Sequence, residues 1–299
     1  MAIPRRQTWL AGRHALVDDI PFRMPVASQT SPALMAVFSI DLEAARRVIP
    51  GNEIHPFQLW RRGLLVVTVI DYVITNIGRY VEYSIAIACT HGRRPAPRLL
   101  PGLLMKAFGT GQYVVDLPVS TEISVKGGRG IWGMPKHQAS LDFVIGERWV
   151  SSQYDLDGKM MMRIDVTKPN SAWLPVSTGA VNYCCFRGML MKSYIYFKGK
   201  LGFSLFAPGS ARLFIGDHPR MAWLKTLDID PIPVATGFFP STAGVLDDYF
   251  ECWFVTEPEP PAQPMPGLET TYPLGQSQQW LAPPARPADW ESAPCPAAC

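Results

Sequence analysis

Hydrophobic stretches of the strand type dominate this chain. Residues 64–74, LLVVTVIDYVI, form a mainly apolar run that is typical of a buried strand, and residues 81–89, VEYSIAIAC, alternate between two faces. The dipeptide Asp157-Gly158 predicts a hairpin turn inside another such stretch. The further stretches that predict strands are residues 112–125, 139–145, 148–166, 194–206, 211–216 and 247–255.

Few segments carry a helical pattern. Residues 41–49 predict a helix with Asp41 as its N-cap and Pro50 as its stop signal. Residues 101–108 begin with proline and end before a glycine, and residues 219–227 predict one more short helix. Many closely spaced strands with few helices predict a mainly β (α+β) fold, either a sheet closed on itself or two packed sheets.

The composition changes near the C-terminal end of the chain. From residue 257 onward proline, alanine and small polar residues dominate, and the strand pattern is lost. We therefore expect residues 257–299 to form a Pro-rich, non-catalytic tail. The same division gives an N-terminal extension at residues 1–19 and one folded domain at residues 20–256.

Composition and charge exclude several classes of function. The formal net charge is only +3, and the densest basic cluster, Arg93, Arg94 and Arg98, is interpreted as a solvated loop, so nucleic acid is not an expected partner. The sequence shows neither a signal-like N-terminus nor an apolar run of about 18 residues, so no membrane partner is expected. The adjacent Cys184 and Cys185 suit a reducing, cytoplasmic location, and no zinc-like spacing predicts a metal.

Gly128, Gly130 and Gly133 have the GxGxxG spacing of a dinucleotide-binding loop. Such a site needs a helix that begins within the glycine pattern. Pro135 follows closely and disfavours helical geometry at the residue before it, so we expect no nucleotide and no other cofactor. We expect these glycines to form a loop that approaches a cavity closely.

Lys136 follows this stretch and is the strongest candidate for chemistry. Ile131, Trp132, Met134 and Pro135 precede it, which favours an apolar, desolvated environment. An amine attacks a carbonyl only without its proton, and at the ordinary lysine pKa of about 10.4 only about one in 2,500 is neutral at pH 7. Burial lowers the pKa of a lysine, so a desolvated amine could act as a nucleophile.

Three stretches resemble the acetoacetate decarboxylase family. They are GRGIWGMPKH at 128–137, GRYVE at 78–82 and DLEAARRVIPG at 41–51, and the resemblance extends over about residues 20–256. It implies a closed, cone-shaped β-barrel or double sheet with a few short helices, and a keto acid or ketone as the small-molecule substrate. It also implies that Lys136 forms a Schiff base, that Glu82 belongs to the active site, and that the protein is a homo-oligomer.

Strand periodicity gives Glu82 independent support. Within residues 81–89, Glu82 shares a face with Ser84, Ala86 and Ala88, and a carboxylate among small residues suits the interior of a barrel with space for a ligand. The alternative is an edge strand with Glu82 in water.

The sequence also departs from the family pattern. His137 replaces a second lysine, so burial alone has to lower the pKa of Lys136, or His137 serves as a proton shuttle. A count without gaps places Ser31 and Val67 where the family carries an arginine and a second glutamate. Arg79 or Arg129 could replace that arginine as the group that binds a substrate carboxylate.

Three aromatic residues complete the candidate site, namely Trp132, Tyr113 and Tyr249. The first hypothesis for function is a lyase that decarboxylates a β-keto acid through an imine on Lys136. The second is a Schiff-base aldolase, dehydratase or cyclase that acts on a larger keto substrate. The third is a non-catalytic barrel that binds a ligand, in which Lys136 forms a salt bridge with Glu82.

Overall fold

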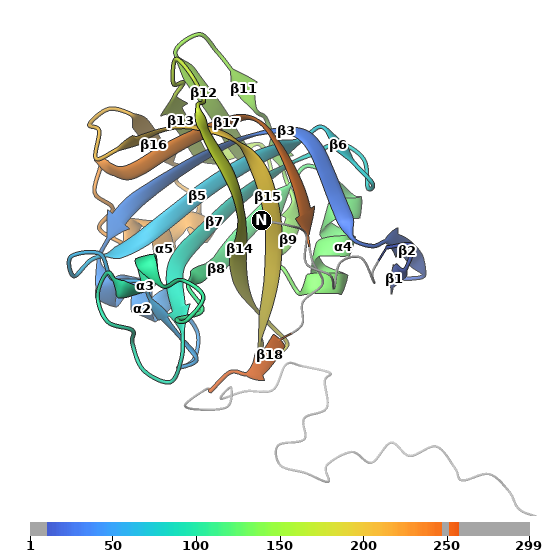
Figure 1. Ribbon diagram of the computed structural model, residues 1–299, viewed down its shortest axis with the longest axis horizontal. Coiled ribbons are helices and arrows are strands. Elements are labelled where there is room, and N and C mark those ends of the chain that lie inside the picture. Colours follow the sequence, from blue (N-terminus) through green and yellow to red (C-terminus); the bar gives the residue numbers. More distant parts are fainter. Residues whose placement is uncertain (1–10, 247–250, 257–299) are drawn as a thin grey trace, which may run out of the picture. The chain divides into compact units, whose positions relative to one another are not determined.

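Long, strongly curved strands close into a barrel. The computed structural model describes residues 11–246 and 251–256. Within them a seven-stranded sheet runs in the order β7-β5-β3-β17-β15-β14-β8, and β8 pairs with β7 to close it (Figure 1). All neighbours are antiparallel except β14 and β8. The pairing of β8 with β7 confirms the closed sheet that the sequence predicts. The strands are β3 (Val26–Ile40), β5 (Gly63–Tyr72), β7 (Tyr80–His91), β8 (Gly111–Val119), β14 (Leu174–Phe186), β15 (Met189–Leu205) and β17 (Pro233–Leu246).

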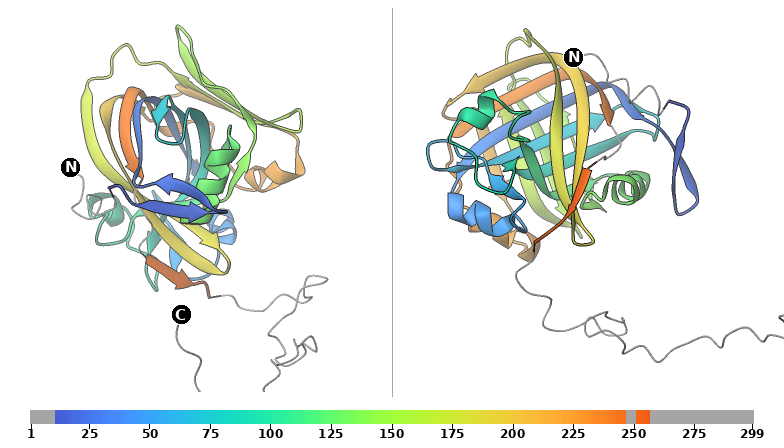
Figure 2. Two further views of the ribbon diagram at one scale, coloured as in Figure 1. Left: turned by 90° about the vertical axis from the view of Figure 1, so that its right-hand side faces the viewer. Right: turned by 60° about the horizontal axis from the view of Figure 1, so that its bottom comes forward.

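Short strands extend the barrel at its edges. β9 lies parallel to β8 and carries the segment around Lys136, while the others pair with β7, β3 and β15. A separate hairpin, β1–β2, contacts helix α4 (Glu122–Trp132) at one end of the barrel (Figure 2). These strands are β1 (His14–Val17), β2 (Ile20–Arg23), β4 (Ile54–Pro56), β6 (Ile74–Thr75), β9 (Lys136–Gln138) and β18 (Glu251–Phe254).

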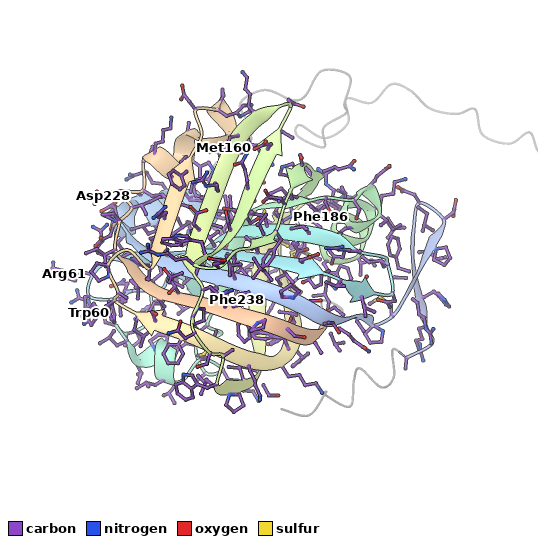
Figure 3. All side chains as sticks on the ribbon, turned by 90° about the horizontal axis from the view of Figure 1, so that it is seen from above. Trp60, Arg61, Met160, Phe186, Asp228 and Phe238 are labelled. Atoms are coloured by element: carbon purple, nitrogen blue, oxygen red, sulfur yellow. The ribbon has the colours of Figure 1, made fainter. Side chains whose placement is uncertain are left out.

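A second, smaller sheet covers one side of the barrel. The Asp157-Gly158 turn joins its two longest strands, with both residues at positive φ, as the sequence predicts. The main core includes Tyr83 and Ile85 of the barrel together with Tyr154 of the second sheet. In Figure 3, Met160 lies on the second sheet and Phe238 on the barrel. The strands are β10 (Ser140–Leu141), β11 (Val144–Ile145), β12 (Trp149–Leu156), β13 (Lys159–Thr167) and β16 (Ala211–Ile215).

The helices are short, with one exception. Asp41 caps its helix as predicted, because its carboxylate accepts a hydrogen bond from the Ala44 amide at 2.7 Å. The helix predicted at 101–108 ends at Leu103, and turns follow it. The helical elements are α2 (Leu42–Val48), α3 (Leu100–Leu103), α4 (Glu122–Trp132), η1 (Pro219–Met221) and α5 (Ala222–Lys225).

Helix α4 corrects two predictions from the sequence. Strand β8 ends at Val119, so the strand predicted at 112–125 is too long, and the glycines predicted to form a loop lie in the helix or at its end. The physical reason is a change of period. Ser124, Gly128 and Ile131 recur every three or four residues and form the buried face of α4.

Residues 11–19 contain β1, and its Val17 packs beside helix α4. The tail predicted at 257–299 lies outside the described residues, so the proposed domain division stays a prediction. Within the described ranges no helix combines the length and the apolar character needed to cross a bilayer.

Candidate active site

The barrel encloses a cavity of about 400 Å³. Strand β7 alternates as the sequence indicates: Glu82, Ser84 and Ala88 face the cavity, whereas Tyr83 and Ile85 face outward and are fully buried under the second sheet. Glu82 therefore points into the barrel and not into water at a sheet edge. Its side chain is 15% exposed.

Lys136 enters the same cavity from strand β9. It lies opposite Leu117 of β8, which also lines the cavity, and only 4% of the residue is exposed. Its Nζ lies 2.6 Å from Oε2 of Glu82 and donates a hydrogen bond of 3.0 Å to Oγ of Ser124. The same nitrogen lies 5.4 Å from the centre of the Tyr80 ring, within the range of a cation–π contact. One carboxylate, one hydroxyl and one aromatic face thus surround the ammonium group.

The C-terminal end of helix α4 and the glycines in it determine where this lysine lies. Gly133 terminates the helix with φ 64°, a left-handed conformation that suits glycine. The Met134 amide then donates to the carbonyl of Gly128 at 3.0 Å, which returns the chain alongside the helix. A Cβ on Gly128 would overlap Cδ of Lys136, so the absence of a side chain there creates the space that the lysine occupies.

Tyr72 and Tyr80 lie beside the ion pair of Lys136 and Glu82. Their rings stack with centroids 4.6 Å apart. Burial, together with the charge of Glu82, raises the pKa of both phenols well above the ordinary value, so both hydroxyls keep their protons at neutral pH. They can donate hydrogen bonds to the carboxylate or to a bound carbonyl group.

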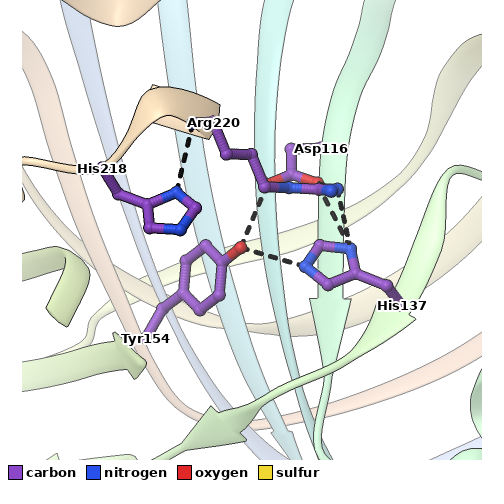
Figure 4. A network of polar contacts seen from close by, with 5 residues as sticks. All are labelled: Asp116, His137, Tyr154, His218 and Arg220. Carbon is purple, nitrogen blue, oxygen red and sulfur yellow. Dashed lines mark hydrogen bonds and ion pairs between the residues drawn. The ribbon is translucent and has the colours of Figure 1, made fainter. Parts of the chain in front are cut away.

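His137 does not face Lys136, which corrects the role that the sequence suggested for it. Successive residues of a strand point to opposite sides, so its ring lies on the outer surface of the barrel. There Nε2 lies 2.9 Å from the Tyr154 hydroxyl, and Nδ1 lies 3.1 Å from the Arg220 guanidinium (Figure 4). Arg220 also donates to Asp116 at 2.8 Å. This network cannot pass a proton directly to Lys136.

Of the described aromatic candidates, one lines the cavity and the other packs outside the barrel. Trp132 is 3% exposed and lines the cavity, close to Lys136 in sequence. Tyr113 packs against the main core on the outer side of β8. Tyr249 lies outside the described residues. Of the two that the structure describes, Trp132 is therefore the one placed to contact a ligand.

The two candidate arginines do not line the cavity. The Arg79 side chain is 67% exposed and forms an ion pair with Asp71 at 2.8 Å, and Arg129 is exposed on α4. The two positions that a gapless count matches to the family's arginine and second glutamate do not line the cavity either. Ser31 and Val67 are fully buried outside the cavity lining, and Val67 belongs to the main core. A gapless count ignores the alternation that decides which side of the sheet a residue faces.

Sequence reasoning missed three residues of the site: Ser124, Tyr72 and Tyr80. Tyr80 could have been found, because it precedes Glu82 by two residues on one strand and so shares its face. Ser124 was hidden by the incorrect assignment of residues 112–125 to a strand. As for metals, no group of three or more histidine, cysteine, aspartate or glutamate residues in the described ranges could hold an ion.

Comparison with known proteins identifies the family. Residues 13–178, more than half of the chain, match the family model of acetoacetate decarboxylase. The chain belongs to the acetoacetate decarboxylase family. No curated protein is similar enough in sequence to match it.

Solved structures agree with the family at the level of the fold. A structure of acetoacetate decarboxylase superposes with a TM-score of 0.55 at 16% identity, over 78% of this chain and 91% of that one. The acetoacetate decarboxylase of Legionella pneumophila subsp. pneumophila str. Philadelphia 1 gives 0.53 at 13% identity, over 75% and 86%. An acetoacetate decarboxylase-like enzyme from Sphingomonas wittichii RW1 gives 0.51 at 13%, over 81% and 100%. The family fold is thus shared, whereas most of the sequence is not.

The environment of His137 predicts a pH dependence of stability. Burial lowers the pKa of His137 below its ordinary value, and Arg220 lowers it further against the opposing charge of Asp116. The unfolded chain then binds more protons than the folded chain as the pH falls through about 6.5. We expect the free energy of unfolding, measured with urea, to fall between pH 7.5 and 5.5, and to fall less in His137→Gln.

His55 and His91, whose pKa values burial also lowers, contribute to the slope of the wild type. The comparison with His137→Gln therefore isolates the contribution of His137. Equal pH slopes for the two proteins would contradict the neutral, buried state of this ring.

Proposed function

We propose that this protein is a Schiff-base enzyme in which Lys136 condenses with the carbonyl group of a keto substrate. The observation that carries the proposal is the placement of the Lys136 amine, buried in a largely apolar cavity within 2.6 Å of one carboxylate. Membership of the family supports the same chemistry. In MppR, a related fold with a TM-score of 0.50 and 15% identity over 74% of this chain and 87% of that one, the product of pyruvate and imidazole 4-carboxaldehyde is bound.

Imine formation begins with a proton transfer along the ion pair. Glu82 accepts a proton from the Lys136 ammonium, and the free amine attacks the carbonyl carbon. The resulting neutral carbinolamine takes this proton back from Glu82 and loses water, which leaves a protonated imine on Lys136. Nitrogen carries one positive charge before and after these steps, so Glu82 keeps its ionic partner. Tyr72 and Tyr80 also line the cavity, and in this proposal their hydroxyls donate hydrogen bonds to the developing alkoxide.

The first proposed reaction is decarboxylation of a β-keto acid. The bond between the α-carbon and the carboxylate breaks, its electron pair moves toward the iminium nitrogen, and carbon dioxide leaves with formation of a neutral enamine. Protonation of the enamine carbon and hydrolysis of the imine then release the ketone and restore the ammonium group. Charge is lost in the cleavage step, and an apolar cavity favours loss of charge.

A second reaction class is favoured by the charges that line the cavity. Among its described lining residues, Lys136 and Glu82 carry the only formal charges, and they pair with each other. An extra substrate carboxylate would therefore lack a separate cationic partner. We propose aldol-type condensation, dehydration or cyclisation of a larger keto compound as the alternative use of the same imine.

A binding barrel without catalysis would contain the same Lys136–Glu82 ion pair. Covalent trapping separates this hypothesis from both reactions, because a non-catalytic barrel forms no imine. The cytoplasmic location and the homo-oligomer stay predictions from the sequence and the family resemblance.

Trapping with borohydride tests the proposal. We expect incubation with acetone or a panel of keto acids, followed by borohydride, to add the reduced substrate to one peptide at Lys136, measured by mass spectrometry after digestion. Lys136→Arg is the matched control, since arginine keeps a cation for Glu82 but forms no imine. A wild-type protein that stays unmodified, or an equal yield in Lys136→Arg, would disprove the imine.

Two further measurements in that experiment assign roles. Glu82→Gln keeps the shape of the side chain but accepts no proton, so we expect the trapping rate to fall by about 10²-fold or more. Release of carbon dioxide from a trapped keto acid supports decarboxylation, whereas adduct formation without gas release from any keto acid favours the alternative reactions.

Gly128 provides a prediction that depends on the fold of the site. Alanine is the better helix former by about 1 kcal/mol, but here its Cβ would displace the Lys136 side chain. We expect Gly128→Ala to lower the trapping rate at least tenfold. Gly130→Ala is the matched control in the same helix, because its Cβ would meet Val17 and not Lys136.

A cooperative thermal unfolding transition checks that each of the two variants is folded. Equal trapping rates in the two folded variants would show that close packing at Gly128 does not position the amine.

A further inference from the structure

The cavity is longer than a small keto acid requires. On β7 both Glu82 and Ala88 line it, and six residues of strand span about 20 Å. Glu82 lies at the end beside α4, where Lys136 enters. Ala88 lies toward the other end, where Phe57 donates a backbone hydrogen bond to its carbonyl and packs beside Gly102 of α3. Figure 1 shows α3 and α4 well apart on the barrel. One continuous cavity thus runs along the barrel, away from the reactive amine.

The wall between these ends is apolar. Its side chains belong mainly to aliphatic and aromatic residues, and the Lys136–Glu82 pair holds the formal charges of the described lining at one end. Burial of an unpaired charge along such a wall would be costly. A ligand that fills the cavity is therefore uncharged along most of its length. Residues that form this middle wall include Val66, Val114, Ala180, Ile195, Phe197 and Phe239.

Two amide side chains lie at the end opposite the amine. Gln112 of β8 and Asn182 of β14 are neighbours in the parallel strand pair, and both line the cavity. Nε2 of Gln112 donates to Oδ1 of Asn182 at 2.8 Å. An amide group has two donors and one acceptor oxygen, so Oε1 of Gln112 and Nδ2 of Asn182 keep the capacity to bind a ligand. In an apolar pocket, a few such polar groups fix the orientation of the ligand.

The nearby Thr110 does not offer the same recognition. Its hydroxyl also lines this end, but it donates to the carbonyl of Pro101 at 2.9 Å. The amide pair is thus the polar feature best placed to contact the far end of a long ligand.

We infer that the cavity binds an elongated ketone that is uncharged beyond its reacting end, with its carbonyl group at Lys136 and a hydroxyl or carbonyl group at its far end hydrogen-bonded by Gln112 and Asn182. The inference rests on the proposed imine chemistry and specifies its substrate class. The apolar chain of the ketone lies along the barrel wall between the two polar ends.

A series of ketones tests the inference. Butanone, dodecan-2-one and 12-hydroxydodecan-2-one are titrated into the full-length protein by isothermal titration calorimetry, which detects binding with or without an imine. We expect dodecan-2-one to bind at least tenfold more tightly than butanone, because each buried methylene contributes about 0.8 kcal/mol. We expect the terminal hydroxyl to improve binding by a further factor of about three to ten.

Variants of the amide pair test the far end. In the double variant Gln112→Leu/Asn182→Leu, the ratio of the affinities for the hydroxylated and the plain ketone should fall to about one or below. The matched control is Gln138→Leu, an exposed glutamine on β9 that does not line the cavity, which should keep the wild-type ratio. The ratio is measured within one protein, so a general loss of stability does not imitate the effect.

The outcomes separate the inference from the proposed function. Equal affinity for butanone and dodecan-2-one, or an unchanged hydroxyl preference in the double variant, overturns the inference even where borohydride trapping succeeds. Tight binding of the long ketones with no adduct at Lys136 overturns the imine chemistry and leaves the elongated binding site.

Discussion

The burial of one ammonium group constrains the rest of this structure. Removal of an ion from water costs several kcal/mol, so a buried lysine requires partners that compensate for the lost hydration. Here Glu82 supplies the charge, Ser124 accepts a hydrogen bond, and the ring of Tyr80 presents its face. These partners come from strand β7 and helix α4. The closed barrel and the helix at its end are thus needed together to hold a single amine.

Strand β9 divides its side chains between two environments. Lys136 points into the cavity, and His137 points outward to Tyr154 of the second sheet and to Arg220 of η1. Asp116 connects the same network to β8. The outer network therefore ties β9 to three other elements, whereas the inner face of β9 turns Lys136 toward the cavity. This division leaves no direct proton path between His137 and Lys136, although the two residues are adjacent in the sequence.

Period-two alternation made part of this site predictable from the sequence. It placed Glu82 on a face of small residues, and the structure shows that face lining the cavity. The Pro-Lys pattern likewise drew attention to Lys136. If the predicted strand had begun one residue earlier, the same rule would have placed Tyr80 on the face of Glu82. Applied to β9, the rule would have placed His137 and Lys136 on opposite faces.

Other features could not be read from local patterns. Residues 122–125 alternate well enough to resemble a strand. The helical period appears only over the longer stretch from Ser124 to Ile131, and its buried face includes Gly127 and Gly128, which add no apolar side chain to the pattern. Strand β14 is only half-buried over most of its length, so its sequence shows little hydrophobic contrast. The far-end pair of Gln112 and Asn182 depends on a parallel contact between strands 70 residues apart, which no short window reveals.

The central claim is that the buried amine of Lys136 reacts with a carbonyl carbon. Carbon-13 NMR of a ketone labelled at its carbonyl carbon, in the presence of excess protein, observes that bond without a reducing agent. We predict that the carbonyl resonance is replaced by an imine resonance in the wild-type protein and persists in Lys136→Arg. A labelled ketone that binds in the cavity of the wild-type protein and keeps its carbonyl resonance would contradict the account.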